Sequence, residues 1–193
     1  TPLTAMRLAE IGLEAGIPEN VFNVLPGFGK IAGQHLVEHP DVQKIVFTGS
    51  TPVGKGIMRA GADRLKRVTL ELGGKSPTII FADADVEAAA KSAPLAVFDN
   101  SGQDCCARSR ILVQESIYDE VLAHIETTVK GVRVGDPSSE DTDMGPLISA
   151  VQRDRVKSFV PAGAPILFQG EAPTGKGFWF PPTVLAPIKP GDL

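Results

Sequence analysis

The sequence predicts an α/β fold with parallel strands, arranged in two successive portions. Three observations indicate this class. Short apolar runs alternate with helical patterns, glycine-bearing turns follow several of these runs, and the pair Gly73-Gly74 marks a boundary between residues 1–72 and residues 73–193. Alternating strand, turn and helix is typical of parallel construction, because two parallel strands need a crossover that is usually a helix.

The first portion is expected to contain three helices and three strands. Thr1 is the expected N-cap of the first helix, with Pro2 at its first position and Gly16 at its end. The remaining elements follow in order: a strand at 21–25, a helix at 31–38, a strand at 44–47, a helix at 52–60 and an apolar strand at 68–72.

The second portion begins with a strand at 78–81, after which Asp85 is the expected N-cap of a helix at 86–98. A polar loop at 100–104 leads to two cysteines and then to the next elements, a strand at 110–114, a helix at 117–132, a loop at 135–145 and a helix at 150–160. The remaining residues are rich in Gly and Pro and are expected to form short strands.

Composition excludes several classes of protein. The 193 residues are 42% hydrophobic and 22% charged, which is enough apolar material for a core and an ordinary charge content. A net charge of −4 with dispersed Lys and Arg gives no electrostatic footprint for nucleic acid, and no apolar run is long enough to cross a bilayer. We therefore predict a cytoplasmic protein without a nucleic-acid or membrane partner.

The first candidate site is the turn from Gly49 to Gly54. An apolar strand brings Gly49 to the start of a helix, where free backbone N–H groups and the helix dipole favour phosphate, and Ser50 can donate a hydroxyl hydrogen bond. The segment has neither the three-glycine dinucleotide pattern nor the phosphate-loop pattern. By spacing alone it is equally a strand-to-helix turn without a ligand.

The second candidate is the adjacent pair Cys105 and Cys106. Most free cysteines of cytosolic proteins are buried and inert. These two follow a polar loop and lie near Arg108 and Arg110, which favours a reactive thiolate, although Asp104 acts against it. A cysteine protease is disfavoured because the three histidines, at positions 35, 39 and 124, fall in predicted helices or at their ends. A zinc site is disfavoured because two adjacent thiols do not make a tetrahedral ligand set.

The third candidate is Glu71, which lies between Leu70 and Leu72 at the end of an apolar strand. The commoner role of such a carboxylate is an edge charge that points to solvent. In a partly dry cleft its pKa would rise, and it could then act as a general base.

Together and in this order, the three segments resemble the aldehyde dehydrogenase superfamily. The 34 residues that separate Glu71 from Cys105 also agree with the family. The motifs that carry the resemblance are Phe47-Thr48-Gly49-Ser50-Thr51 with Gly54, Glu71-Leu72-Gly73-Gly74-Lys75-Ser76-Pro77, and Gly102-Gln103-x-Cys105-x-Ala107. The resemblance implies a Rossmann-like nucleotide-binding portion at 1–72 and the catalytic lobe at 73–193, both incomplete.

The resemblance also implies roles for individual residues. Cys105 is the nucleophile that adds to an aldehyde, and Glu71 is the base that activates water, so that a carboxylic acid forms through a thiohemiacetal and a thioester. The hydride acceptor is NAD or NADP, no metal is needed, and the parent protein is a homo-oligomer. The cofactor-binding residues are Gly49, Ser50 and Gly54 at the pyrophosphate, Val53 near the adenosine, Gly29 beside the adenine and Leu72 at the nicotinamide.

Several family segments fall outside the chain. The oxyanion-hole asparagine and a ribose-binding lysine would precede Thr1, and a Glu-x-x-Phe-Gly-Pro segment would follow Leu193. We therefore expect the central part of a longer protein, and we expect it to be inactive alone, as a nucleotide-binding or folding unit. Another alternative is a thiol esterase that uses Cys105 and Glu71 without a cofactor. A CoA-acylating enzyme is disfavoured, because such enzymes tend to lack the base that Glu71 supplies.

Overall fold

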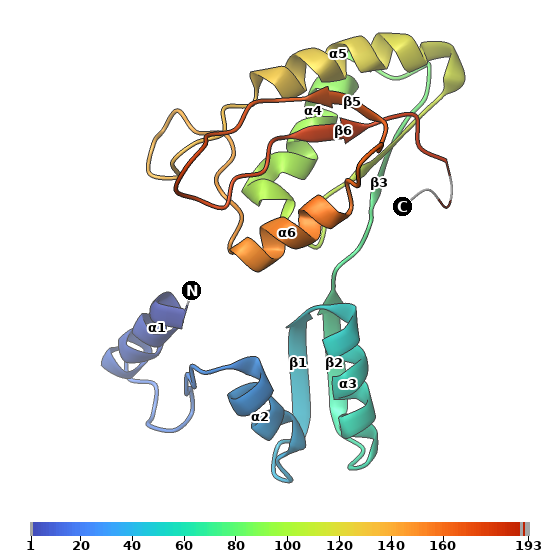
Figure 1. The fold of residues 1–193 in the computed structure, drawn as a ribbon. Coiled ribbons are helices and arrows are strands. Elements are labelled where there is room, and N and C mark those ends of the chain that lie inside the picture. Colours follow the sequence, from blue (N-terminus) through green and yellow to red (C-terminus); the bar gives the residue numbers. More distant parts are fainter. Residues whose placement is uncertain (1, 190, 192–193) are drawn as a thin grey trace. The chain divides into compact units, whose positions relative to one another are not determined.

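The computed structural model describes residues 2–189 and 191, and the chain divides into two compact units, Thr1–Leu72 and Gly73–Leu193 (Figure 1). The predicted N-cap at Thr1 lies outside the described residues. The division falls at the Gly73-Gly74 pair. The assignment of the two units to a nucleotide-binding domain and a catalytic domain stays a prediction.

The first unit contains a β-α-β crossover. Strand β1 (Lys44–Gly49) pairs in parallel with β2 (Arg67–Leu72), and helix α3 (Thr51–Ala62) connects them. Figure 1 shows the two strands side by side with α3 next to them. The buried residues of α3 are Gly54, Ile57 and Gly61, whose spacing of three and four places them on one face of the helix.

The remainder of the first unit is helical or irregular. It contains α1 (Pro2–Glu14), a π-helical turn (Gly29–Gly33) and α2 (Gln34–Glu38), which agrees with the predicted helices. The predicted strand at 21–25 is wrong, because these residues form no strand. Val21 and Leu25 are 70% and 65% exposed, and within the described part of the chain no strand lies alongside to supply ladder hydrogen bonds.

The second unit repeats the crossover. Strand β3 (Pro77–Ile80) pairs in parallel with β4 (Arg110–Val113), and α4 (Val86–Phe98) connects them. The Asp85 side chain accepts a 3.0 Å hydrogen bond from the Ala88 backbone N–H, which confirms the predicted N-cap. The other elements are short 3-10 turns (Asp99–Gly102 and Glu115–Ile117), α5 (Tyr118–Gly131), α6 (Ala150–Ser158) and the antiparallel strands β5 (Ile166–Gln169) and β6 (Thr183–Leu185).

The core of the second unit lies between α4, α5 and the strands. Val121, Ile125 and Val129, one helical turn apart along α5, are almost completely buried. Phe168 of β5 and Val184 of β6 pack against this cluster, and Figure 1 shows α5 running along these strands. The predicted α/β class with parallel strands is confirmed. Among residues 2–189 and 191, no helix has both the length and the apolar character that a bilayer span requires.

Candidate active site

The turn after β1 leaves the N-terminus of α3 accessible. Ser50 is the N-cap residue with an extended backbone (φ −79°, ψ 147°), but its side chain makes no capping hydrogen bond. Pro52 occupies the first turn of α3, and no acidic side chain lies there. The Ser50 hydroxyl and the positive end of the helix dipole therefore fit an anionic group such as a phosphate.

The glycines of this turn have packing roles. Gly54 is buried, and a Cβ atom at this position would lie 2.9 Å from Leu72 Cδ2, so Gly54 allows α3 to pack closely on β2. A Cβ atom at Gly49 would overlap the Phe47 ring. That Gly49, Gly54 and Leu72 also contact a cofactor stays a prediction.

Val53 and Gly29 are the other predicted cofactor residues of the first unit. Val53, in the first turn of α3, is 50% exposed. Gly29 is exposed at the start of the π-helical turn, and a Cβ atom there would meet no atom within 4 Å. Both residues are accessible to a ligand, and their roles stay predictions.

Glu71 lies on the open face of the β1–β2 sheet. Along β2, exposed and half-buried residues alternate, and Leu70 and Leu72 face Gly54 of α3 while Glu71 is exposed. Its register partner on β1 is Thr48, which is also exposed. Glu71 forms no hydrogen bond or ion pair with any residue that the structure describes, so its carboxylate is accessible to water.

Cys105 and Cys106 are both free and exposed, so the alternative of buried thiols is wrong, while their reactivity stays a prediction. Asp104 lies next to both cysteines, and its carboxylate accepts a 3.3 Å hydrogen bond from the Cys106 backbone N–H. A hydrogen bond from the Cys106 side chain to the Asp104 carboxylate raises the pKa of the Cys106 thiol. The pKa of Asp104 is lowered, first by the Cys106 backbone N–H and then by hydrogen bonds from the side chains of Cys106 and Cys105. Asp104 therefore disfavours the Cys106 thiolate.

The ligating atoms of Asp104, Cys105 and Cys106 lie within 4.8 Å of one another, the spacing of a possible metal group. All three residues are exposed and successive in sequence. Arg110, one of the two arginines expected to make this loop electropositive, is partly engaged elsewhere, since its Nε donates a 2.6 Å hydrogen bond to the Lys75 carbonyl.

The sequence analysis missed the backbone conformation of the loop before Cys105. Asn100, Ser101 and Gly102 have φ values of 48°, 58° and 71°, three successive residues in the left-handed region. Only the Asn-x-Gly pattern could have indicated such a turn. A Cβ atom at Gly74 would lie 3.4 Å from the Cys105 carbonyl oxygen, so the backbone of Gly74 passes beside Cys105.

Glu71 belongs to the first unit and Cys105 to the second. That they face one cleft stays a prediction.

Comparisons with known proteins bear on the whole chain. The aldehyde dehydrogenase family model matches residues 1–192. An aldehyde dehydrogenase of Aspergillus niger is 46% identical over 97% of this chain and 39% of that protein. Cytosolic 10-formyltetrahydrofolate dehydrogenase of Xenopus tropicalis is 44% identical over 97% of this chain and 21% of that protein.

Solved structures give the same result. The match to the crystal structure of PnpE in complex with nicotinamide adenine dinucleotide has a TM-score of 0.89 and a sequence identity of 46%. It covers 95% of this chain and 39% of the PnpE chain. The chain thus spans 39% or less of the length of these relatives. The match of the family model from residue 1 to residue 192 shows that the chain belongs to the aldehyde dehydrogenase family.

Proposed function

We propose that this chain supplies the nucleophile, the general base and part of the cofactor site of an NAD(P)-dependent aldehyde dehydrogenase, which oxidises an aldehyde to a carboxylic acid. The observation that carries the proposal is the exposed Cys105, which follows a left-handed turn in a chain of this family. The place of Glu71 in the motif Glu71-Leu72-Gly73-Gly74 of this family supports its role as base, although its exposed carboxylate also matches the alternative of an edge charge. A cytoplasmic location and a homo-oligomeric parent are part of the proposal.

In the proposed mechanism, the Cys105 thiolate forms a bond to the carbonyl carbon of the aldehyde, and the carbonyl oxygen takes the negative charge. Bound NAD(P)⁺ supplies the hydride acceptor. Loss of hydride leaves an acyl group on Cys105 as a thioester. Glu71 then accepts a proton from water as the water oxygen adds to the acyl carbon, and the carbon–sulfur bond breaks to release the acid and the thiolate.

The cofactor would be held in the first unit. The Ser50 hydroxyl and the N-terminus of α3 fit its pyrophosphate, because no acidic side chain of the first turn competes there. Val53 and Gly29 are accessible for its adenosine portion, and Leu72 ends the strand that leads to the second unit. The NAD complex of PnpE supports a nicotinamide dinucleotide as the ligand.

The chemistry of Cys105 can be tested with p-nitrophenyl acetate, which needs no cofactor. We expect the chain to release nitrophenol and to carry an acetyl group on Cys105, which peptide mass spectrometry locates. Cys105→Ala removes this adduct, Glu71→Gln keeps it but slows its hydrolysis by about 10²–10⁴-fold, and the matched control Cys106→Ala changes neither. Acetylation that persists in Cys105→Ala would contradict the proposed nucleophile.

A second candidate for the isolated chain is nucleotide binding without turnover. Apolar side chains of the first unit favour this candidate: Leu3 is 75% exposed, Phe28 83% and Val46 66%. Such side chains suit a surface that further polypeptide covers, and the isolated chain would then lack part of the structure that turnover requires. Calorimetric titration with NAD⁺ or NADP⁺ is then expected to show binding, while an added aldehyde yields no reduced nicotinamide. Ser50→Asp, which places a negative charge at the N-terminus of α3, should weaken that binding. Reduced nicotinamide that disappears in Cys105→Ala would exclude this candidate.

A further inference from the structure

We propose that Ser101 and Gln103 are positioning residues that fasten the loop of Cys105 to the segment 145–148. The inference rests on the proposed function, because it concerns the placement of the proposed nucleophile. Two side-chain hydrogen bonds to residues that are 44 and 45 positions away in sequence carry it.

The first step is the backbone that these residues must maintain. Asn and Gly tolerate the left-handed region, but Ser101 has a Cβ atom that is unfavourable at a φ of 58°. Three such residues in succession persist only where surrounding contacts hold them. Within the turn, the Gln103 backbone N–H donates to the Asn100 carbonyl at 3.1 Å, and Asn100 Nδ2 donates to the Gln103 carbonyl at 3.1 Å.

The second step is the attachment across the loop. Ser101 Oγ donates to the Gly145 carbonyl at 2.7 Å, and the Ile148 backbone N–H donates to Gln103 Oε1 at 3.0 Å. The two bonds lie on either side of Gly102 and run in opposite directions. One hydrogen bond would fix only the distance between the turn and the segment 145–148. Two separated hydrogen bonds also fix the orientation of the turn.

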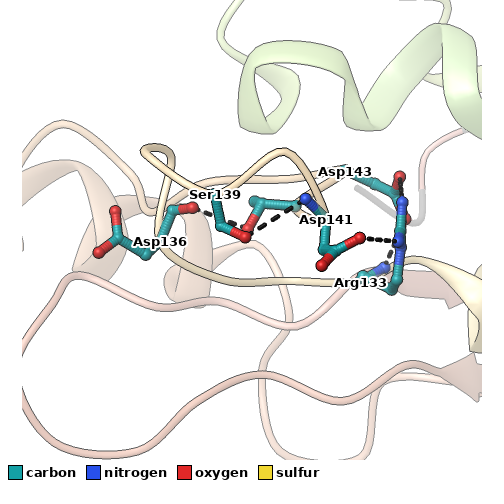
Figure 2. Close-up of polar contacts among 6 residues, drawn as sticks. Arg133, Asp136, Ser139, Asp141 and Asp143 are labelled. Atoms are coloured by element: carbon teal, nitrogen blue, oxygen red, sulfur yellow. Dashed lines mark hydrogen bonds and ion pairs between the residues drawn. The ribbon is translucent and has the colours of Figure 1, made fainter.

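The third step is that the segment 145–148 is itself held. Leu147 is 5% exposed, and its backbone N–H donates to the Phe178 carbonyl at 3.0 Å. Just before the segment, Arg133 forms two bonds to the carboxylate of Asp143, Nε to Oδ2 at 3.0 Å and Nη2 to Oδ1 at 2.9 Å. Figure 2 shows Arg133 beside Asp143 and Asp141, with Ser139 and Asp136 farther along the same loop. The turn is therefore fastened to a fixed support.

Cys105 follows Gln103 by two residues, so the position of its sulfur depends on this attachment. The chain contains two cysteines, and in Cys106→Ala a thiol-reactive fluorine probe, bromotrifluoroacetone, labels Cys105 alone. The fluorine resonance of this labelled parent is expected to differ between the folded chain and the chain in concentrated urea. In this parent, Ser101→Ala and Gln103→Ala are expected to move the folded resonance towards the urea value.

Conservative and control variants separate positioning from general stability. Gln103→Glu keeps the acceptor for the Ile148 N–H and loses only the 3.2 Å bond from Nε2 to the Asn100 carbonyl within the turn. Its resonance should therefore lie closer to the parental value than that of Gln103→Ala. Ser101→Gly removes the hydroxyl without adding backbone strain, and it replaces Ser101→Ala in the measurement if that variant does not fold. Ser158→Ala is the matched control, because Ser158 Oγ donates to the Arg155 carbonyl at the same 2.7 Å, but within α6.

The inference would be overturned if the fluorine resonance of the folded parent equalled its value in urea. It would also be overturned if the resonance stayed at the parental value in folded Gln103→Ala and in folded Ser101→Ala or Ser101→Gly. The measurement needs neither an aldehyde nor a nucleotide. If the acetylation test failed, the proposed function would be contradicted. The fluorine resonances would still show whether Ser101 and Gln103 hold the loop, so the two failures are distinguishable.

Discussion

The two units share a β-α-β crossover but differ in how completely they enclose it. In the first unit, α3 packs on one face of β1 and β2. Among the described residues, the buried hydrophobic side chains of this unit are Val37 of α2 and Ile57 of α3. The second unit adds α5 and the β5–β6 pair to its crossover. Its described residues include ten buried hydrophobic side chains: Ile80, Ala90, Ala93, Ile117, Val121, Ile125, Val129, Val132, Met144 and Leu147. The second unit has a core of its own, whereas the first has one covered face.

This difference separates the two candidate catalytic residues. Glu71 projects from the uncovered face of the first unit, next to Thr48 on β1. Cys105 follows a turn that hydrogen bonds fasten within the enclosed unit. We conclude that the placement of Cys105 is an intrinsic property of its unit, while the surroundings of Glu71 depend on what covers the β1–β2 sheet.

The largest expected effect is in the enclosed core. Ile125→Ala removes buried methyl groups from a side chain that is 2% exposed and should lower the free energy of unfolding by about 2–5 kcal/mol. Ile79→Ala, at a position that is 56% exposed, should change it by less than about 0.5 kcal/mol. Trp179, the single tryptophan, reports urea unfolding of the second unit. Both residues lie in the second unit, so equal unfolding midpoints for the two variants would contradict the enclosed core of that unit.

The next effect concerns the single covered face of the first unit. Gly54→Val introduces branched carbon atoms against Leu72, whereas a side chain at Gly56 meets no atom within 4 Å. Both variants have the same helix propensity cost, so Gly54→Val should be less stable than Gly56→Val by about 1–3 kcal/mol because of overpacking. Circular dichroism during urea unfolding gives both values. Indistinguishable variants would mean that α3 does not need close contact with β2.

The loop of Figure 2 gives a pH dependence to the second unit. Hydrogen bonds from Arg133 lower the pKa of Asp143 from an ordinary 3.8 to about 2. Because the folded pKa lies below the unfolded value, the stabilisation is complete above about pH 4 and is lost as the pH falls towards 2. Between these pH values, the wild-type unfolding midpoint should fall more steeply than that of Asp143→Asn. Asp141→Asn, in the same loop, should retain the steep fall, and a parallel fall in both variants would contradict this assignment.

The smallest effect is on the second thiol. The Asp104 carboxylate raises the pKa of Cys106, so Asp104→Asn should lower that pKa and allow faster alkylation of Cys106 near neutral pH. Iodoacetamide rates measured against pH in a Cys105→Ala background report this change. Asp99→Asn, a nearby acid without this contact, is the control, and an equal shift in it would assign the effect to net charge instead.

Hydrophobic periodicity was sufficient for most of the fold, because α3, α5 and the parallel strands each bury one regular face. The pattern failed at Val21 and Leu25, since an apolar run forms a strand only where a partner strand supplies hydrogen bonds. Periodicity also could not assign Gly54, whose burial against Leu72 depends on how closely a helix approaches a strand.

For the candidate site, residue types indicated Cys105 and Glu71, and both are exposed in the structure. The support of Cys105 could not be predicted, because the Ser101 bond to Gly145 joins two loops that no local pattern relates. Left-handed φ at Ser101 is likewise a consequence of tertiary contacts, since serine alone does not favour it.

The parallel pairing of β1 with β2 has a practical consequence for handling the protein. In the part of the chain that the structure describes, each of these strands pairs with the other alone, so its outer edge carries backbone groups that can recruit a strand from another molecule. Concentrated solutions of the chain should therefore self-associate through the first unit. A lysine in place of Val46, whose side chain is already exposed, is a conservative way to restore solubility without disturbing the second unit.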